Sequence, residues 1–372
     1  VRLTVGLKLM PTAEQALALR QTLEAANAAA NAISAAAWRE RTFGQFKLHK
    51  LTYADTRALT RLSAQVVVRV ISKVADAYKL DRSRQRQFAP LGSLAYDDRI
   101  LRYRSDDVSI WTIAGRQSIQ FVCGPRQRAL LVQRQGESDL VYRDDTWFVY
   151  ATANVVEEPV AEVTDVLGVD LGIVNIAADS DGRVYSGGHV NGLRHRARRL
   201  RKRLQARNTR SAKRLLKARR RKEHRFGTWV NHTLSKRIVA EAQGTARAIA
   251  MEELGGIRER VSARQPQRAT LHSWSFNQLR LFVAYKASLA GVRVVYVDPR
   301  NTSRTCPACG LVDKRNRPTQ ASFVCVECGL AGHADTIAAL NIRARGRGVC
   351  NASKRRGVES CVESLSGKCR LP

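Results

Sequence analysis

The sequence is poor in acidic residues. Its 372 residues include 32 Asp and Glu against 64 Lys and Arg, which gives a formal net charge of +32 at pH 7. Solubility alone does not require an excess of this size, so the charge predicts a polyanionic partner, most simply nucleic acid. A generic basic protein, such as a ribosomal protein, is the alternative, but those chains are usually far shorter.

Long apolar runs are also missing. No stretch is long enough to cross a bilayer, and we find no secretory signal. We therefore expect no membrane partner and a cytoplasmic, nucleoid-associated location in a bacterium. The chain has eight cysteines, and without an export signal these favour metal binding over disulfide bonds.

Four of the cysteines form two Cys-x-x-Cys pairs. Cys306 and Cys309 make the first pair, Cys325 and Cys328 make the second, and each pair is followed by glycine. The pairs are separated by 15 residues, 310 to 324, which is the spacing of a four-cysteine zinc site. We predict that these four thiolates bind one structural Zn²⁺. A redox pair is the alternative, but it needs only one copy of the motif.

Three acidic residues stand at the ends of predicted elements. Asp170 ends an apolar strand that begins at Val166, Glu252 follows the apolar run 248–251, and Asp335 precedes a helix predicted over 336–342. A carboxylate beside a buried strand is costly unless something pairs with it, and a metal ion is the usual partner. Glu253 is the weaker alternative to Glu252, and Asp335 also suits a helix cap.

The order of elements from residue 166 is strand, strand, strand, helices, strand, helix, strand, insert, helix. This is the order expected of an RNase H-like fold, in which a mixed sheet brings three distant carboxylates together. We predict that Asp170, Glu252 and Asp335 are catalytic and hold two Mg²⁺ ions. Such a pair of ions activates a water and stabilises the leaving oxygen of a phosphodiester.

The first part of the chain combines strands and helices. Residues 1–10 alternate as a strand, a helix follows to about residue 39, and a second helical stretch runs from about 53 to 80. Between 93 and 156 the pattern predicts an antiparallel barrel, with strands at 109–113, 117–122, 129–133, 140–142 and 146–152. Gln65 and Lys73 lie on the polar face of the second helical stretch. They are candidate nucleic-acid contacts, and a solvated face explains them equally well.

The segment 194–225 is the most basic part of the chain. Of its 32 residues, 17 are Lys or Arg, and Glu223 is the only acid. Charge of one sign at this density repels itself unless a polyanion lies against it. We predict two helices along nucleic acid, with a break near Asn208. Their predicted contact residues are Arg198, Arg201, Lys202, Arg203, Lys213, Arg214, Arg219, Arg220 and Arg221.

Four motifs resemble those of TnpB, the nuclease encoded by small insertion sequences and related to the compact type V CRISPR effectors. They are Val169-Asp-Leu-Gly172, Met251-Glu-Glu-Leu254, Thr302-Ser-Arg-Thr-Cys-Pro-Ala-Cys-Gly310 and Ala334-Asp-Thr-Ile-Ala-Ala-Leu-Asn-Ile342. The resemblance covers nearly the whole chain and implies a multidomain α/β protein. The implied parts are a wedge β-barrel (1–10 and 83–160), a helical recognition module (11–82), a RuvC-like nuclease (161–302 and 331–346) and a zinc ribbon (303–330). Residues 347–372 are predicted to be a disordered basic tail.

The resemblance also implies a function. The RuvC acids correspond to Asp170, Glu252 and Asp335, and Arg304 matches a family position associated with holding the scissile strand. Such a protein binds an RNA from the transposon end, pairs its guide with double-stranded DNA beside a short motif, and cuts both strands. We expect a monomer with one RNA.

Two other functions remain as alternatives. The first is an RNA-guided repressor or transposition regulator that does not cut, which the intact acids disfavour. The second is a transposase that joins DNA strands itself, which the density of the TnpB-like motifs and the position of the ribbon disfavour.

Overall fold

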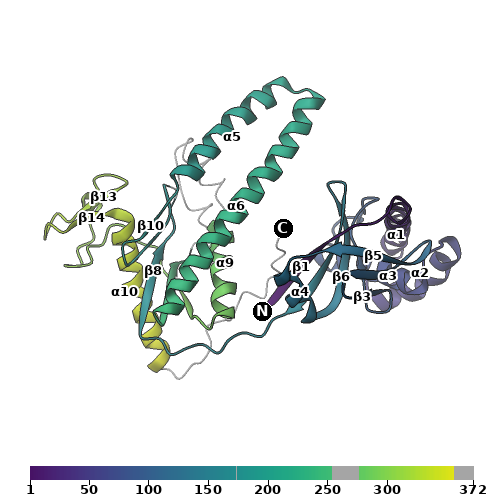
Figure 1. Ribbon diagram of the computed structural model, residues 1–372, viewed down its shortest axis with the longest axis horizontal. Coiled ribbons are helices and arrows are strands. Elements are labelled where there is room, and N and C mark those ends of the chain that lie inside the picture. Colours follow the sequence, from purple (N-terminus) through teal and green to yellow (C-terminus); the bar gives the residue numbers. More distant parts are fainter. Residues whose placement is uncertain (173, 254–275, 356–372) are drawn as a thin grey trace. The chain divides into compact units, whose positions relative to one another are not determined.

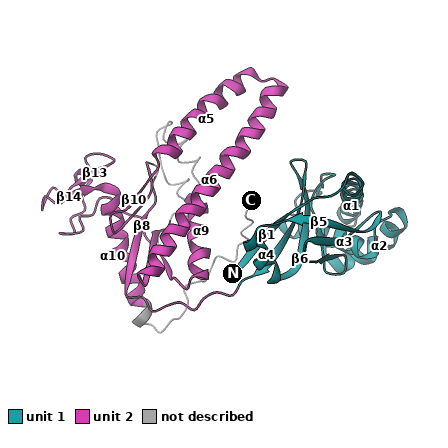
Figure 2. Cartoon of the chain, in the orientation of Figure 1, with its two compact units in different colours: residues 1–155, 368–372 teal, residues 156–367 magenta. Residues whose placement is uncertain are grey.

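The computed structural model describes residues 1–172, 174–253 and 276–355 of the chain (Figure 1). The described residues form two compact units (Figure 2). One holds Val1–Val155 and the other begins at Val156. No helix among the described residues is long and apolar enough to span a membrane. The stretch 258–273, whose polar, Arg- and Gln-rich sequence predicts a flexible segment, lies outside these residues.

The first unit contains three helices, α1 (Ala13–Arg39), α2 (Gln45–Leu59) and α3 (Ala64–Leu80). α1 begins with a capping box, in which the Thr12 hydroxyl accepts from the Gln15 backbone N–H at 3.3 Å and the Gln15 side chain accepts from the Thr12 N–H at 3.1 Å. The prediction of a single helical stretch from 53 to 80 is wrong, because α2 ends at Leu59 and α3 begins at Ala64. Ser63 caps a new helix, because its hydroxyl accepts from the Val66 N–H.

A seven-stranded antiparallel sheet completes this unit, in the order β2-β6-β7-β1-β5-β4-β3. The strands are β1 (Arg2–Leu9), β2 (Leu94–Tyr96), β3 (Leu101–Tyr103), β4 (Asp107–Thr112), β5 (Gly115–Val122), β6 (Arg134–Arg143) and β7 (Thr146–Asn154). β1 pairs with both β7 and β5, so the first strand joins this sheet, as predicted, and lies in its middle. β2 and β3 are the two ends of the strand order in this sheet, for which the sequence predicted an antiparallel barrel.

One predicted strand of this unit is a helix. Residues 129–133 fall in and just after α4 (Pro125–Val132), which Pro125 opens at its first position. Proline is favoured there because its ring presets the helical φ angle. The N–H that it lacks would have no partner in the first turn of a helix. The prediction was wrong because a short apolar run such as Ala-Leu-Leu-Val suits either element.

One apolar core joins the helices of this unit to its sheet. Strand residues contribute Leu7, Leu9, Ile110 and Val149, and helix residues contribute Leu19, Leu23, Val67 and Ile71, all of them at most 2% exposed. The apolar face of α3 therefore packs against the sheet. Removing this area from water supplies the main favourable free energy of folding for the unit.

The second unit is built on a five-stranded mixed sheet in the order β10-β9-β8-β11-β12. Its strands are β8 (Asp165–Asp170), β9 (Asn175–Asp179), β10 (Val184–Ser186), β11 (Arg247–Glu252) and β12 (Val294–Val297). β11 runs parallel to β8 and to β12, whereas β9 is antiparallel to β8 and to β10. The central strand β8 thus has one neighbour of each orientation.

Helices cover both faces of this sheet. α6 (Arg210–Gly244) and α9 (Phe276–Leu289) pack on one face, and α10 (Ala334–Arg355) packs on the other (Figure 1). Successive residues of a strand point to opposite faces. Leu167, Val169, Ile249 and Met251 accordingly lie in the core with α6 and α9, and Val166, Ala248 and Ala250 lie in the core with α10.

α10 lies unusually close to the sheet because of two glycines. A Cβ atom on Gly168 of β8 would stand 2.1 Å from the Ala339 carbonyl oxygen, and one on Gly346 of α10 would stand 2.6 Å from the Ala250 Cβ. The absence of both side chains lets the helix backbone rest on β8 and β11. These two contacts, at Ala339 and Gly346, lie about two turns apart along the helix and together fix the position of α10 on the sheet.

The predicted disordered tail is wrong for its first residues. α10 continues to Arg355, and Cys350 is 5% exposed in the core beneath the sheet. Arg343 and Arg347 both pair with Asp165 at the start of β8, with a nitrogen–oxygen distance of 2.6 Å for Arg347. These contacts extend the helix beyond the predicted boundary at 347. Residues 356–372 lie outside the described residues.

The basic segment forms a helical hairpin. α5 (Gly188–Arg207) and α6 are joined at Asn208, whose φ of 49° is left-handed, and Thr209 caps α6 by accepting from the Ala212 N–H at 3.2 Å (Figure 1). Asparagine adopts this conformation more readily than most residues. The break predicted near Asn208 is therefore confirmed.

Candidate carboxylate site and zinc centre

Asp170 and Glu252 end two neighbouring parallel strands. Val169 of β8 pairs with Met251 of β11, so the residues that follow them, Asp170 and Glu252, stand side by side at the same edge of the sheet. Both strands are short, apolar and buried up to that point. The two predicted acids therefore meet because of the parallel register.

Asp335 reaches the same edge from α10, where it lies in the first turn. Its Oδ2 accepts a hydrogen bond from Asn175 Nδ2 at 2.9 Å. Gly172 follows Asp170 closely in the chain, and a Cβ atom on it would lie 2.7 Å from the Asn175 carbonyl oxygen and 4.0 Å from Asp335 Oδ2. The glycine therefore gives the loop after β8 room beside this carboxylate.

The electrostatics link all three carboxylates. Burial, then the charges of Glu252 and Asp335, raise the pKa of Asp170 to about 8. Burial also raises the pKa of Glu252, and a hydrogen bond from the Thr302 hydroxyl, 2.6 Å from Oε1, opposes this shift. The site thus holds more negative charge than its surroundings neutralise, which is the environment that a divalent cation relieves.

Thr302 is itself held in place. Its backbone carbonyl and that of Thr305 each accept a hydrogen bond from Asn341 Nδ2 at 2.7 Å. Asn341 belongs to α10, the helix that also carries Asp335. One helix therefore supplies one carboxylate directly and positions a second one, Glu252, through Thr302.

Glu253, the weaker alternative, faces elsewhere. Its side chain is 49% exposed and pairs with Arg280 of α9. That arginine lies over the Tyr296 ring, 4.8 Å from the centroid. The geometry favours Glu252 as the acid of this strand.

Sequence reasoning missed Arg317. Its guanidinium Nη2 lies 3.7 Å from Asp335 Oδ1, and its charge lowers the pKa of Asp170 against the larger effects that raise it. Arg304 was predicted for the site, but its side chain is exposed, and the described residues show no contact between it and the carboxylates. Nothing in the local sequence distinguishes Arg317, since its position depends on how the cysteine segment folds onto α10.

The donor set suits divalent metal ions. Carboxylate oxygens are the ligands that Mg²⁺ prefers. Within the described ranges, the four cysteines are the only group of three or more His, Cys, Asp or Glu with ligand atoms all within 4.8 Å of one another. Three carboxylates at one sheet edge suit a pair of ions, which stand roughly 3.5–4 Å apart in two-metal sites.

The four predicted cysteines form the tight cluster. Cys306 Sγ lies 3.5 Å from Cys328 Sγ, and Cys309 Sγ lies 3.5 Å from Cys325 Sγ. Tetrahedral zinc with Zn–S bonds of about 2.3 Å requires sulfur atoms about 3.8 Å apart, so these positions fit the ion. The clustering confirms that the four cysteines are placed to bind zinc.

The two cysteine pairs share one backbone conformation. The Gly310 N–H donates to the Cys306 carbonyl at 2.9 Å, and the Gly329 N–H donates to the Cys325 carbonyl at 3.1 Å. Both glycines have positive φ, 78° and 73°, which explains why each pair ends in glycine. Asn316 links the two turns: its Nδ2 donates to the Leu311 carbonyl, and its Oδ1 accepts from the Val326 N–H.

The predicted nucleic-acid contacts fall into two groups. On the α5–α6 hairpin, eight of the nine predicted residues are exposed, Arg221 is half-buried, and Arg201 pairs with Glu223. The other two are occupied within the protein. Lys73 Nζ donates to Asn27 Oδ1 and the Ser93 carbonyl, each at 2.6 Å, and Gln65 bonds to Asp97 and Arg99. These bonds favour a packing role for Gln65 and Lys73.

Comparisons with known proteins match parts of the chain. A family model described as "Probable transposase" matches residues 147–251, and one described as "Cas12f1-like, TNB domain" matches residues 276–342. The chain is 39% identical over 121 residues to the CRISPR-associated endodeoxyribonuclease Cas12f1 of Sulfoacidibacillus thermotolerans, which covers 32% of this chain and 26% of that protein. It is 37% identical over 112 residues to a TnpB-like protein of Methanocaldococcus jannaschii, which covers 30% of this chain and 40% of that protein.

A solved structure extends the likeness. The cryo-EM structure of a Cas12f1–sgRNA–target DNA complex has a TM-score of 0.59 and 14% identity, covering 88% of this chain and 83% of that one. At this identity the match shows the fold alone. The sequence matches span less than half the length of the two curated relatives. The resemblance to TnpB predicted from the motifs is confirmed, as is a compact α/β fold like that of Cas12f.

Proposed function

We propose that the protein is an RNA-guided endonuclease that cuts double-stranded DNA beside a short motif. The observation that carries this proposal is the convergence of Asp170, Glu252 and Asp335 at one sheet edge, with the Asp170 pKa raised to about 8. Relatives named endodeoxyribonucleases and the fold of a Cas12f1 complex support it. The sheet order β10-β9-β8-β11-β12 is that expected of an RNase H-like, RuvC-type nuclease.

The three carboxylates would hold two Mg²⁺ ions, which activate a water and stabilise a leaving oxygen. The protein's own contribution is to orient the ligands. Asn175 Nδ2 donates a hydrogen bond to Asp335, and the Thr302 hydroxyl donates one to Glu252, so each carboxylate is held by a neighbouring side chain. Arg317 places a fixed positive charge beside Asp335, where it suits a phosphate of the bound strand.

We assign the zinc ion a structural role. The four thiolates would complete a tetrahedral site with no open position, so no substrate group can bind the ion. The ion would hold the two glycine turns together and, through Asn316, the segment that carries Arg317. We also propose an assignment of domains to the two units. The first unit would hold the wedge and the recognition module, and the second would hold a RuvC-like nuclease with its inserted ribbon.

RNA and DNA partners fit the charge. The exposed arginines and lysines of the α5–α6 hairpin would neutralise phosphates without reading sequence. Base pairing between the guide and the target would supply the specificity. A monomer with one RNA is the assembly we propose.

The test begins with the RNA that copurifies with the protein. Sequencing it identifies the guide, and a DNA duplex matching the guide is then offered with Mg²⁺. We expect cleavage by the wild type and none by Asp170→Ala, with target binding retained by both. Binding without cleavage in any divalent metal would show that the protein is not a nuclease.

The alternative is an RNA-guided repressor that does not cut. The intact carboxylates disfavour it. A cell reporter repressed equally by the wild type and by Asp170→Ala, without loss of target DNA, would favour it over cleavage.

A further inference from the structure

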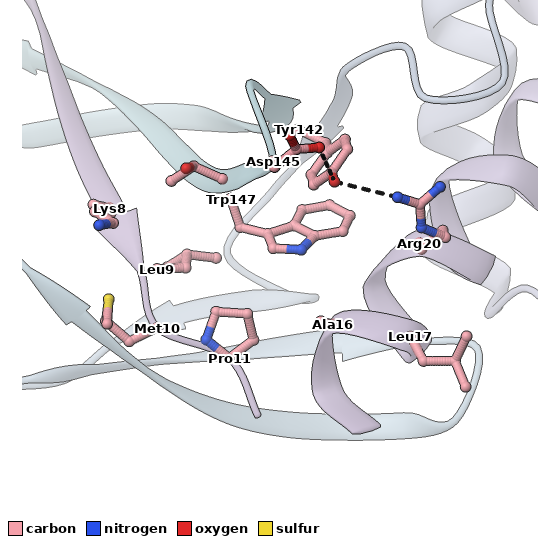
Figure 3. Close-up of a pocket in the computed structure, with 11 residues that line it drawn as sticks. Lys8, Leu9, Met10, Pro11, Ala16, Leu17, Arg20, Tyr142, Asp145 and Trp147 are labelled. Carbon is pink, nitrogen blue, oxygen red and sulfur yellow. Dashed lines mark hydrogen bonds between the residues drawn. The ribbon is translucent and has the colours of Figure 1, made fainter. Parts of the chain in front are cut away.

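The first unit contains a pocket that the proposed chemistry does not use. It lies between the end of β1, the start of α1 and the β6–β7 hairpin, and has a volume of about 510 Å³ (Figure 3). Ligand pockets usually range from about 300 to 1,000 Å³. Its lining residues are Lys8, Leu9, Met10, Pro11, Ala16, Leu17, Arg20, Tyr142, Asp145, Thr146 and Trp147.

Trp147 carries the strongest signal in this pocket. The residue is only 5% exposed, and its indole nitrogen is drawn toward the space beside Pro11 (Figure 3). No hydrogen-bond partner for this N–H is recorded among residues 1–172, 174–253 and 276–355. The nitrogen is not among the described buried polar atoms that lack a partner, so it has accessible surface, and the pocket is the space that it faces. It therefore offers a hydrogen-bond donor to a molecule that enters the pocket.

A chain of polar contacts fixes the wall opposite. Arg20 Nη2 donates to the Tyr142 hydroxyl at 3.2 Å, and that hydroxyl donates to Asp145 Oδ1 at 3.1 Å (Figure 3). The Arg20 guanidinium also lies over the Tyr142 ring, 5.1 Å from its centroid. Tyr142 is thus fixed at its hydroxyl, and Arg20 lies over its ring.

The aromatic pair is held by the hairpin itself. Tyr142 and Trp147 are directly opposite in the β6–β7 register, and their ring centroids are 4.6 Å apart. The turn between them has positive φ at Asp144 and Asp145, 58° and 57°. Asn, Asp and Gly are the residues that favour such turn positions, and the turn places Asp145, an acceptor, at the pocket.

The mouth of the pocket carries two basic and two large apolar side chains. Lys8 is exposed on β1, and the Arg20 side chain, which is 42% exposed, lies 3.8 Å from a carboxylate oxygen of Glu24. Met10 and Leu17 are 50% and 55% exposed, which is high for large apolar side chains. A ligand that is flat and aromatic, hydrogen-bonds along its edge and carries a negative charge nearby matches all of these groups.

We propose that this pocket binds one unpaired nucleobase of a nucleic-acid strand. The base packs against the aromatic pair and accepts from the Trp147 N–H, while Asp145 accepts from an N–H group on its edge. Lys8 and Arg20 contact the adjoining phosphate. The proposal rests on the proposed function only in that it takes nucleic acid to be the partner, and it does not require cleavage.

The first test blocks the mouth of the pocket, since variants of the buried Trp147 risk misfolding. Leu17→Trp fills the mouth from an exposed position on α1, and Leu80→Trp makes the same change on α3, where the residue is 85% exposed outside the pocket. Short single-stranded oligonucleotides of uridine and of deoxythymidine serve as probes in a binding titration. We expect Leu17→Trp to weaken binding of at least one probe about tenfold, as the loss of one stacked base should, and Leu80→Trp to leave it within twofold.

The second test locates the base. Probes carrying bromouracil are irradiated with the full-length protein, and the crosslinked peptide is identified by mass spectrometry. Crosslinks to Tyr142 or Trp147 support the proposal, and whether the RNA or DNA probe reacts more identifies the strand. Unchanged binding by Leu17→Trp together with crosslinks only to other segments would overturn it. Both readouts are independent of cutting. A protein that binds a base in the pocket but does not cleave DNA would therefore contradict the proposed nuclease function and leave the pocket proposal intact.

Discussion

The cysteine centre and the carboxylate site are both candidate sets of metal ligands, but they form in different ways. The four cysteines come from residues 306–328, and two local turns bring their sulfur atoms within 4.8 Å of one another. The three carboxylates come from residues 170, 252 and 335, and only the sheet register and the packing of α10 bring them together. The first site is encoded in a short motif, whereas the second is encoded in the fold of a whole unit.

This difference implies different vulnerabilities. A local site depends on its own ligands, because the ion itself supplies the free energy that holds it. A site assembled by packing depends on residues far from it, such as Gly168 beneath α10 and Gly346 within that helix. Arg317 connects the two, since it belongs to the cysteine segment and lies 3.7 Å from Asp335.

The largest expected effect separates the two neighbouring glutamates. We expect Glu252→Gln to lower the rate of guided DNA cleavage about a thousandfold, because it removes a metal ligand from the site. Glu253→Gln is the matched control. That side chain pairs with Arg280 away from the carboxylates, so the rate should stay within about twofold. Equal losses in the two variants would contradict the assignment of Glu252.

Removing zinc tests whether the local site supports the distant one. Cys325→Ser should abolish zinc binding, measured by elemental analysis, and should lower cleavage about tenfold or more because Arg317 loses its support. Cys123→Ser, a cysteine of the first unit outside the cluster, should keep one zinc per chain and full activity. Full activity of a zinc-free protein would break the link proposed through Arg317.

Substitutions at two glycines of α10 test the packing that brings the three carboxylates together. Gly346→Ala should destabilise the second unit by about 1–3 kcal/mol, because the new Cβ meets Ala250 and Val166 at 2.6 and 2.9 Å. Gly348→Ala, two residues on, has open space and should stabilise the helix by about 0.5–1 kcal/mol. Denaturant unfolding checks both. The same sign for the two variants would rule out close packing as the cause.

The smallest expected effect is on pH dependence without metal. The pKa of Asp170 is raised to about 8, above the value of roughly 4 in the unfolded chain. A raised pKa means that stability is fully present below pH 4 and is lost as pH rises through about 8. In a chelator, the unfolding temperature of the wild type should therefore fall between pH 5 and pH 9 relative to that of Asp170→Asn. Glu162→Gln, an exposed carboxylate, should follow the wild type.

The sequence predicts most of what these two sites need. The cysteine spacing alone leads to the cluster, and the three acids are found because each stands at the end of a recognisable apolar element. Arg317 is not predictable in this way. Its surroundings, Lys-Arg-Asn-Arg-Pro, show no periodicity, and only the folded ribbon brings it to Asp335.

Local ambiguity explains the other errors. Ala129-Leu-Leu-Val132 is apolar enough for a strand, but Pro125 starts a helix over it. The tail after residue 347 is basic and rich in glycine, yet Cys350 is buried and Arg347 pairs with Asp165, so packing extends the helix. In both places a single contact or cap outweighs the composition of the segment.

The close packing of α10 has a consequence for how this chain tolerates changes in length. Asp335 and Gly346 are eleven residues apart, close to three helical turns, so they share one face of the helix. A one-residue insertion or deletion between them would turn Asp335 by about 100° away from Asp170. The loops of the ribbon carry no such constraint, so relatives should differ in length there and keep this stretch of helix at constant length.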